Sequence, residues 1–436
     1  MTIVSLPMSV ILHVCSLRQR GDCDEWLAHA APEVKKLSET VNGPMFELLA
    51  KRCRLQPGDA DCINMFREGA LPFTSACVAL LTMLLLSTGA DLYTGDPHDL
   101  WRSCRESNSQ LLASLREDAN EDGLHELTKE DWQKSRMTRP LPAPAHDLGQ
   151  VRLHESLRPL GICLHDFLMW QVRCVPRFGV EQGLKADGSK KLRAVDHFSW
   201  SYQESGKRKR AKKEVKAASV NGHYDMPCAV EHDHLDQLLA ALRMHMEVVG
   251  EARISTHDRL VSRYGFCLQV PGLWKSDVDS AFRRVPVNPE HSWATGRQPL
   301  AAKHAGCDNI YVRDSGVAYL HHGVPLIALH KGMPFGATAS VVAWHRVGAL
   351  LATIARDVLH LPIYRYVDDY FAADRHVIWP SCSLLCHGRA CLCRPEAMEH
   401  SMNIFARLVR LLLGETSIAA RKLECGLELV VLGVKV

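Results

Sequence analysis

The decapeptide IYRYVDDYFA, residues 363–372, places two adjacent carboxylates between two aromatic and β-branched runs. The pattern predicts a β-hairpin with Asp368 and Asp369 at its turn. Two neighbouring anions repel each other, and aspartate is a poor strand former, so this arrangement costs stability unless a cation compensates. A divalent metal ion would supply that charge.

A second acidic strand end lies upstream in SDVDSAFRRVP, where Asp277 and Asp279 close an apolar strand. Magnesium takes oxygen ligands, usually one or two carboxylates together with substrate phosphates. Two-metal phosphoryl transfer requires carboxylates from separate elements, and the two segments would provide them. Either motif alone is common in solvated turns, so only their ordered combination is specific.

The elements that must position these carboxylates can be read from residue periodicity. Residues 177–200 predict a strand pair with a turn at 186–189, and 274–287 and 316–329 predict further strands. A helix is expected after Gly336, because Val347, Leu351, Ile354 and Val358 form an apolar stripe typical of a core-facing helix.

Composition indicates an ordinary globular protein. The chain has 436 residues, of which 47% are hydrophobic and 23% charged, which predicts about two or three folding units and excludes a disordered, collagen-like or coiled-coil chain. The net charge of +3 predicts no global attraction to polyanions.

One stretch of the chain is strongly basic, because residues 185–216 hold 11 Lys/Arg against 4 Asp/Glu. The loop 207–216 within them is either a solvated loop or nuclear-import signal, or a phosphate-contacting loop.

The 16 cysteines are spread irregularly, and no secretory signal precedes them. We therefore expect reduced thiols and an intracellular protein, nuclear or cytoplasmic. The uncharged run 69–90 is long enough to span a bilayer, but its polar residues and lack of a basic flank favour a buried helix over membrane association.

Five ordered motifs resemble those of reverse transcriptases, and among them those of mobile elements. KKLRAVDHFS is similar to the fingers strand, WKSDVDSAFRRVPV to motif A, MPFGATAS to motif B, YVDDY to motif C, and KLECGLELVVLGVKV to the end of the palm. The resemblance covers about residues 175–436. It implies an α+β fold, with polymerase fingers and a palm built on an antiparallel sheet backed by helices.

The resemblance also implies a division of the chain. Residues 1–140 would form a mostly helical N-terminal region, for which we find no chemistry. Residues 141–272 would form the fingers with the basic loop 207–216, and residues 273–436 the palm with a Cys-rich insertion at 376–395. No segment corresponds to a thumb or an RNase H domain.

The resemblance assigns the metal ligands. Asp277 and Asp368 are implied to hold two Mg²⁺ ions, for which Mn²⁺ could substitute. Asp369 completes the acidic triad, and the main-chain carbonyl of Val278 matches a further ligand by position. The implied partners are dNTPs and an RNA or DNA template-primer.

The substrate contacts follow in the same way. Phe282 matches the aromatic residue beneath the incoming sugar, where its ring would exclude a 2′-hydroxyl, so a DNA product is implied. Arg193 and Lys191 match the cations that hold the triphosphate, as guanidinium groups grip phosphate oxygens well. Without the resemblance, Phe282 would be a core aromatic and the two cations ordinary surface charges.

The remaining matches lie in the palm. Pro334, Phe335 and Gly336 match the motif B turn that contacts the nascent base pair, with glycine allowing close backbone approach. Lys422 matches a lysine that protonates pyrophosphate, and Leu432–Gly433 resembles the primer-grip turn.

The Cys-rich insertion departs from the family pattern. Its possible zinc ligands follow no standard zinc-module spacing, so we expect a Cys-rich loop rather than a zinc site. These ligands would be Cys382, Cys386, His387, Cys391 and Cys393.

Three functions compete. The first is an RNA-directed DNA polymerase of a retroelement, and the second is a catalytically silent, truncated or domesticated relative that binds nucleic acid or has a structural role. The intact triad and Phe282 favour the first. The third, an RNA-directed RNA polymerase, is disfavoured by Val367 before the acidic pair and by Phe282.

Overall fold

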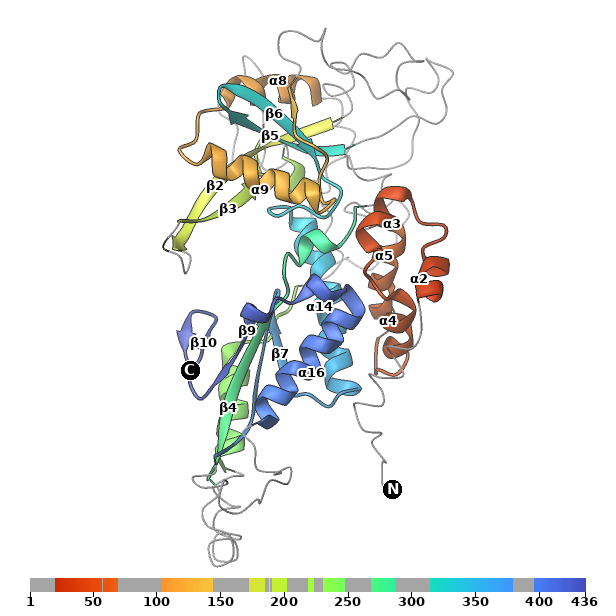
Figure 1. Cartoon of the computed structure of the whole chain (residues 1–436), viewed down its shortest axis with the longest axis vertical. Coiled ribbons are helices and arrows are strands. Elements are labelled where there is room, and N and C mark those ends of the chain that lie inside the picture. The colour runs from red at the N-terminus through yellow and green to blue at the C-terminus, as the bar shows by residue number, and fades with distance from the viewer. Residues whose placement is uncertain are drawn as a thin grey trace, which may run out of the picture.

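The computed structural model describes residues 20–56, 58–69, 104–143, 172–184, 188, 190–201, 219–222, 230–247, 268–287, 314–378 and 396–436. They form an α+β structure with two main sheets in two lobes (Figure 1). This confirms the expected fold class at the level of α+β.

The helices fall into an N-terminal group, a pair before the first strand, and helices that follow later strands. They are α2 (Arg20–Trp26), α3 (Pro32–Ser38), α4 (Gly43–Ala50), η1 (Asp59–Asn64), α5 (Met65–Glu68), α8 (Cys104–Ser114), α9 (Glu121–Gln133), η4 (Val220–Gly222), a helix over 235–247, η5 (Phe282–Arg284), α14 (Thr338–Asp357), α16 (Glu396–Leu413), η6 (Glu415–Ser417) and η7 (Ala420–Lys422).

The first lobe contains a five-stranded sheet in the order β1-β6-β5-β2-β3. All neighbours in it are antiparallel except β2 and β5, which are parallel. Its strands are β1 (Leu141–Pro142), β2 (Val172–Leu184), β3 (Lys190–Asp196), β5 (Asp314–His321) and β6 (Val324–Leu329). The pairing of β2 with β3 and the strands in 316–329 confirm the sequence-based expectations.

Helices α8 and α9 pack on this five-stranded lobe. Leu111 of α8 is buried with Cys174 and Ile327, and Leu124 of α9 is buried with Tyr319.

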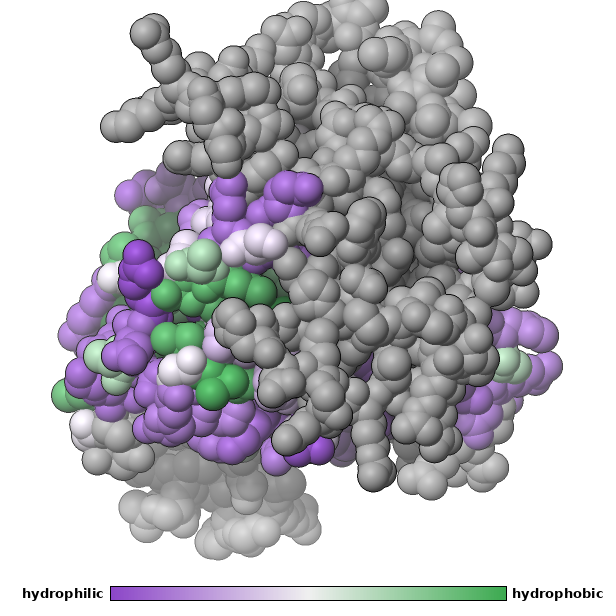
Figure 2. Space-filling view, turned by 90° about the horizontal axis from the view of Figure 1, so that it is seen from above, coloured by the Kyte–Doolittle hydropathy of each residue, from purple (hydrophilic) through white to green (hydrophobic). Residues whose placement is uncertain are grey.

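Seen from above, the described surface is largely hydrophilic around a smaller hydrophobic strip (Figure 2).

The second lobe contains an antiparallel four-stranded sheet in the order β7-β8-β4-β9. Its strands are β4 (Leu268–Asp277), β7 (Ile363–Tyr366), β8 (Asp369–Ile378) and β9 (Leu423–Gly426), and β10 (Val430–Val431) and β11 (Val434–Lys435) form a separate hairpin. The hairpin predicted at 363–372 is confirmed. The strand predicted at 274–287 is correct only as far as Asp277, because the chain turns after that residue and forms η5 (Phe282–Arg284).

Successive side chains of each strand point to opposite faces of the sheet, and both faces are buried. Trp274 and Tyr370 point into the core formed with α14 and α16, whereas Leu273 and Phe371 pack with Leu238 of the helix over 235–247. Strands buried on both sides are held rigidly, which suits an edge that must position charged groups.

Helix α14 is the central helix of this core. Val347, Leu351 and Ile354 are fully buried, as the apolar stripe predicted, and Val358 is partly buried beside them. Among the described residues, α14 is the one helix long and apolar enough to cross a membrane, and 67% of its apolar window is buried inside the protein. The run 69–90 lies mostly outside the described residues.

The N-terminal helices contribute to the same core. Phe46 of α4, Ile63 of η1 and Phe66 of α5 are buried in one cluster with α14 and α16. Helices α4 and α5 lie beside α14 in Figure 1. Helices on the N-terminal side of residue 140 thus pack against both lobes. The domain boundaries taken from the sequence stay predictions.

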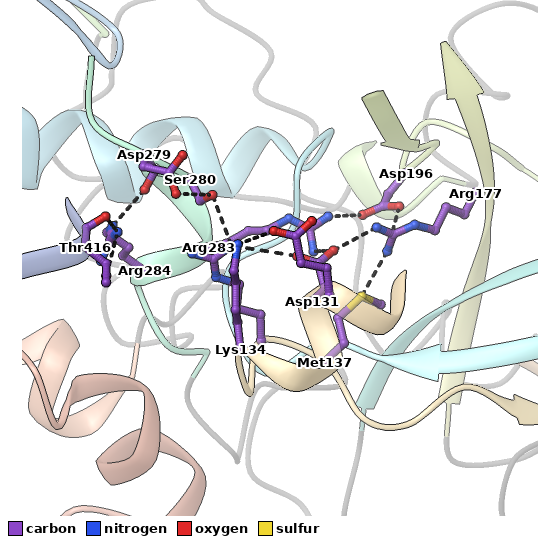
Figure 3. Close-up of polar contacts among 12 residues, drawn as sticks. Asp131, Lys134, Met137, Arg177, Asp196, Asp279, Ser280, Arg283, Arg284 and Thr416 are labelled. Atoms are coloured by element: carbon purple, nitrogen blue, oxygen red, sulfur yellow. Dashed lines mark hydrogen bonds and ion pairs between the residues drawn. The ribbon is translucent and has the colours of Figure 1, made fainter. Parts of the chain in front are cut away.

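A buried ion cluster joins the two lobes (Figure 3). Arg283, in η5 directly after the β4 segment, contacts Asp131 of α9 at 2.7 Å and Asp196 of β3 at 3.3 Å. Arg177 of β2 contacts the same two carboxylates at 2.9 and 3.6 Å. Because each arginine contacts both aspartates, the cluster ties η5 to the five-stranded lobe.

Replacing Arg177 by methionine should destabilise the protein strongly. The side chain is 1% exposed, and its loss leaves two buried carboxylates sharing one arginine, which costs about 3 kcal/mol. We expect a lower urea midpoint for Arg177→Met with an unchanged slope. The matched control is Arg54→Met, whose ion pair with Asp357 has a 92% exposed arginine and should change stability by less than about 1 kcal/mol. Equal losses in the two variants would contradict the role of the cluster.

Candidate active site

Three carboxylates meet at one end of the four-stranded sheet. Asp277, the last residue of β4, is the register partner of Asp369, the first residue of β8. Asp368 occupies the turn that joins β7 to β8, and its carbonyl oxygen accepts a hydrogen bond from Val278 N at 3.2 Å. The pairing of β4 with β8 therefore brings Asp277 together with acidic residues 91 and 92 positions later in the sequence.

Burial and neighbouring carboxylates raise the proton affinity of Asp368 and Asp369. Burial raises the pKa of Asp369 to about 6, with further contributions from Asp368 and Asp277. Burial also raises the pKa of Asp368, and Asp277 adds to that shift. Asp277 Oδ1 is buried and accepts no hydrogen bond from the described part of the chain. A buried carboxylate oxygen without a hydrogen bond, beside two carboxylates with raised pKa values, fits the oxygen ligand set of a divalent cation.

Lys422 provides partial compensation from η7. Its ammonium nitrogen lies 2.6 Å from Asp277 Oδ2 and 3.5 Å from Asp279 Oδ1. Burial alone would raise the pKa of Asp279, but Lys422, the Ser280 hydroxyl and two arginines outweigh it and lower that pKa. The charge of Asp279 is thus compensated by neighbouring cations. In this respect Asp279 differs from the cluster formed by Asp277, Asp368 and Asp369.

The turn that carries Asp368 has a strained backbone. Val367 adopts φ +53°, which is rare for a β-branched residue and costs on the order of 1–3 kcal/mol. Its carbonyl oxygen accepts hydrogen bonds from Trp344 Nε1 at 3.1 Å and Arg365 Nη1 at 2.9 Å. Its N–H donates to His232 Nδ1 at 3.4 Å. These contacts hold the conformation that presents Asp368.

An arginine and two aromatic rings from three of the predicted motifs form a row, and the arginine at its end acts on Asp368. The guanidinium of Arg193, on β3, lies 3.9 Å from the ring centroid of Phe335. Phe335 in turn lies 5.8 Å from the centroid of Phe282. Arg193 is exposed and close enough to favour the ionised form of Asp368. Lys191 lies on the same strand and is also exposed.

The turn before α14 fits against the five-stranded lobe. Gly336 has φ +103°, and a Cβ there would lie 2.1 Å from the carbonyl oxygen of Asp196. Asn221 donates to Gly336 O at 3.0 Å and accepts from Thr338 N at 2.9 Å. Sequence reasoning missed Asn221; its only signal was the Asn-Gly turn dipeptide.

A pocket of about 330 Å³ opens beside the carboxylates. Asp277 and Asp369 line it together with Lys422, and the β10–β11 hairpin closes another side. Leu432 and Gly433 form the two-residue turn of that hairpin, with φ +50° and +80°. The residues matched to the primer grip therefore adjoin the acidic cluster.

Two features of the sequence lie outside the described residues, namely the basic loop 207–216 and the cysteines and histidine of the Cys-rich segment. Val278 is described: it is fully buried between Asp277 and Asp279.

No family model matches the chain, and no curated protein matches its sequence. Solved structures give distant likenesses. The foamy viral protease-reverse transcriptase in complex with double-stranded DNA has a TM-score of 0.29 at 13% identity over 90% of this chain, which spans 45% of that one. Telomerase from Candida albicans, with a fragment of telomeric RNA, has a TM-score of 0.26 at 10% identity, covering 70% of this chain and 46% of that one.

Apo telomerase from Candida tropicalis, truncated from its C-terminal domain, has a TM-score of 0.27 at 9% identity. The alignment covers 93% of this chain and 94% of that one. Likenesses of this size carry no weight, so the functional conclusion depends on the residues of the site.

Gly336→Ala should disrupt the junction between the lobes. The new methyl group collides with backbone and also meets left-handed strain, so we expect a loss of about 3 kcal/mol or more. Gly433→Ala is the matched control, since Gly433 has φ +80° but no atom within 4 Å of the added Cβ, and strain alone costs about 1 kcal/mol. Both are measured by urea unfolding. Similar losses would show that the contact with Asp196 is unimportant.

The acidic cluster should make stability pH-dependent. The folded-state pKa of Asp369, about 6, exceeds the unfolded value of about 4, so the native state binds the proton more tightly. Without divalent cations, stability should therefore fall as pH rises from about 4 to about 6. Asp369→Asn should flatten this decline, whereas Asp236→Asn, an exposed change in the helix over 235–247, should not. Urea unfolding across this pH range in a chelator provides the measurement, and identical profiles for the two variants would contradict the charge coupling.

Proposed function

We propose that the chain is an RNA-directed DNA polymerase of retroelement type, which adds dNTPs to a primer 3′-hydroxyl on an RNA or DNA template. The observation that carries the proposal is the convergence of Asp277, Asp368 and Asp369 at one sheet end. Arg193 is close enough to Asp368 to favour its ionised form, and it stands at one end of a row that continues through Phe335 and Phe282. All three are matched to the nucleotide contacts. Fingers and palm would correspond to the five- and four-stranded lobes.

The acidic cluster would hold the metal ions. Asp277 and Asp368 would be ligands of two Mg²⁺ or Mn²⁺ ions, with Asp369 as the third acid and the Val278 carbonyl as a further oxygen. When bound, these ions would lower the pKa of the primer hydroxyl and neutralise the triphosphate. The orphaned Oδ1 of Asp277 and the raised pKa of Asp369 support this assignment.

The other residues would bind and orient the substrates. Arg193, with Lys191 on the same strand, would grip the triphosphate from β3. The ring of Phe282 would lie beneath the sugar and reject a 2′-hydroxyl. Phe335 would hold the Arg193 guanidinium in place through their stacking, and Gly336 would let the template approach the backbone.

Lys422 would act on the leaving group. Its ammonium carries protons that pyrophosphate needs as it departs. In the structure that ammonium pairs with Asp277, and Lys422 would be free to turn toward the triphosphate when Asp277 serves as a metal ligand. Positioning and charge neutralisation then account for catalysis without a covalent intermediate.

A catalytically silent protein that binds nucleic acid or has a structural role is the second candidate, because convergent carboxylates alone do not demonstrate turnover. An RNA-directed RNA polymerase is disfavoured by the bulk of Phe282. The two remaining candidates differ in one property, which is template-dependent extension.

The proposed activity is tested by dNTP incorporation on poly(rA)/oligo(dT) with Mg²⁺ or Mn²⁺. Wild type should extend the primer, and Asp368→Asn should lower the rate by at least about 1,000-fold. Asp236→Asn, a surface change of the same kind, should retain the wild-type rate. No extension by a folded protein that binds the template-primer would favour the silent alternative.

The sugar gate needs a separate comparison. Phe282→Ala should accept ribonucleotides, whereas wild type should reject them, when both are given rNTPs on the same template. Equal discrimination by the two proteins would make Phe282 a core aromatic and would remove the reason for specifying a DNA product.

A further inference from the structure

A second group of metal-ligating side chains lies on the five-stranded lobe, where α9 begins and the β5–β6 hairpin turns. His321 Nε2 and His322 Nε2 each lie 3.2 Å from Asp122 Oδ1. The candidate ligand atoms of the three residues all lie within 4.8 Å of one another. None of these residues belongs to the acidic cluster or to the matched motifs.

The spacing of the ligand atoms suits a tetrahedral ion. Zinc binds histidine nitrogen at about 2.0–2.1 Å and carboxylate oxygen at about 2.0–2.2 Å, so ligand atoms at the tetrahedral angle lie about 3.3–3.4 Å apart. The two nitrogen–oxygen distances of 3.2 Å nearly match that edge. Small side-chain rotations would place an ion between the three groups.

A carboxylate behind His322 sets which ring nitrogen faces the site. His322 Nδ1 lies 3.1 Å from Glu121 Oε1, and Glu121 Oε2 accepts the His322 backbone N–H at 3.2 Å. If Nδ1–H donates to Glu121, Nε2 of a neutral ring directs a lone pair at the Asp122 oxygen. Two acceptors that face each other need either a proton on Nε2, which makes an ion pair, or a metal ion between them, and His321 Nε2 at the same distance from the same oxygen favours the metal ion. A carboxylate that orients a histidine ligand is a common feature of zinc sites.

The protein backbone and a neighbouring ring hold the other groups in place. The two-residue turn at His322 and Gly323 has φ +49° and +74°, which is the geometry of a tight type I′ hairpin. His321 stacks on His125, with ring centroids 4.0 Å apart. His125 is itself fixed, since its Nδ1 lies 2.8 Å from the Tyr319 hydroxyl.

We propose that Asp122, His321 and His322 form a zinc site whose fourth position is open to water. Imidazole with carboxylate is a ligand set that zinc accepts readily. The ion would cross-link the start of α9 to the tip of the β5–β6 hairpin, residues about 200 positions apart in the sequence. The site is independent of the proposed polymerase activity and of the cysteines at 382–393.

Zinc binding is measured on the full chain, free of any affinity tag, by competition with a chromophoric zinc chelator. His322→Ala should bind one Zn²⁺ fewer than wild type, or bind it at least ~10-fold more weakly. His360→Ala is the matched control, because His360 is exposed and has a similar φ of +53° but lies outside the cluster. It should bind zinc as wild type does.

Asp122→Asn is a second variant that keeps the shape of an exposed side chain, so it separates ligand loss from misfolding. It should also lose the ion, and Glu121→Gln should weaken binding ~10-fold by removing the carboxylate that orients His322. Equal zinc binding by wild type, His322→Ala and Asp122→Asn would overturn the site, as would a wild type that binds no zinc.

Cobalt substitution identifies the ligands. Co²⁺ held by nitrogen and oxygen should give visible absorption bands without the near-ultraviolet thiolate band that cysteine ligands add. Bands that are present in wild type and His360→Ala but missing in His322→Ala would support the proposal. A thiolate band that persists in His322→Ala, with no other bands lost, would assign the metal to cysteines instead.

Discussion

The pairing of β4 with β8 is the constraint on which the rest of the structure depends. Its register sets Asp277 opposite Asp369 and places Asp368 at the adjoining turn. Hydrogen bonds of the ladder therefore hold like charges together that would separate in an unconstrained chain. Burial at this sheet end raises the pKa of Asp368 and Asp369, and the neighbouring carboxylates raise it further. We propose that a fold that holds such repulsion offers a preformed site for cations.

The surrounding structure keeps that register fixed. Trp344 of α14 is fully buried, and its indole nitrogen donates to the carbonyl of Val367, so the core helix directly fixes the acidic turn. On the other side, Arg283 follows Asp277 by six residues and contacts the carboxylates of the five-stranded lobe. The short segment from Asp277 to Arg283 thus carries a carboxylate of the site at one end and a contact to the neighbouring lobe at the other. The geometry of the site is therefore coupled to the packing of the lobes.

Local patterns predicted the parts of the fold that depend on neighbouring residues. The hairpin at 363–372, the β2–β3 pair and the buried stripe of α14 all follow from periodicities of two or 3.6 residues. The meeting of Asp277 with Asp369 did not follow from periodicity. The ligand needs of a two-metal site and the order of the motifs that resemble those of reverse transcriptases suggested it. The row formed by Arg193 and the two aromatic rings did not follow from periodicity either.

Contacts between distant polar residues could not be predicted from the sequence. Asn221 reaches Gly336 across 115 positions, and His321 reaches Asp122 across 199. Nothing in either local sequence specifies such a partner, because the meeting depends on how whole elements pack. Charge-balanced aspartates such as Asp279 are likewise indistinguishable from cluster members until Lys422 is placed.

The most direct test of the account is Mn²⁺ binding followed by electron paramagnetic resonance. The full chain is mixed with a template-primer ending in a dideoxynucleotide and the next dNTP, so that no turnover occurs. We predict about two Mn²⁺ ions at the site, lost in Asp277→Asn and in Asp368→Asn but kept in Asp279→Asn. Equal Mn²⁺ binding by wild type and Asp368→Asn would contradict the claim that the paired carboxylates form a metal site.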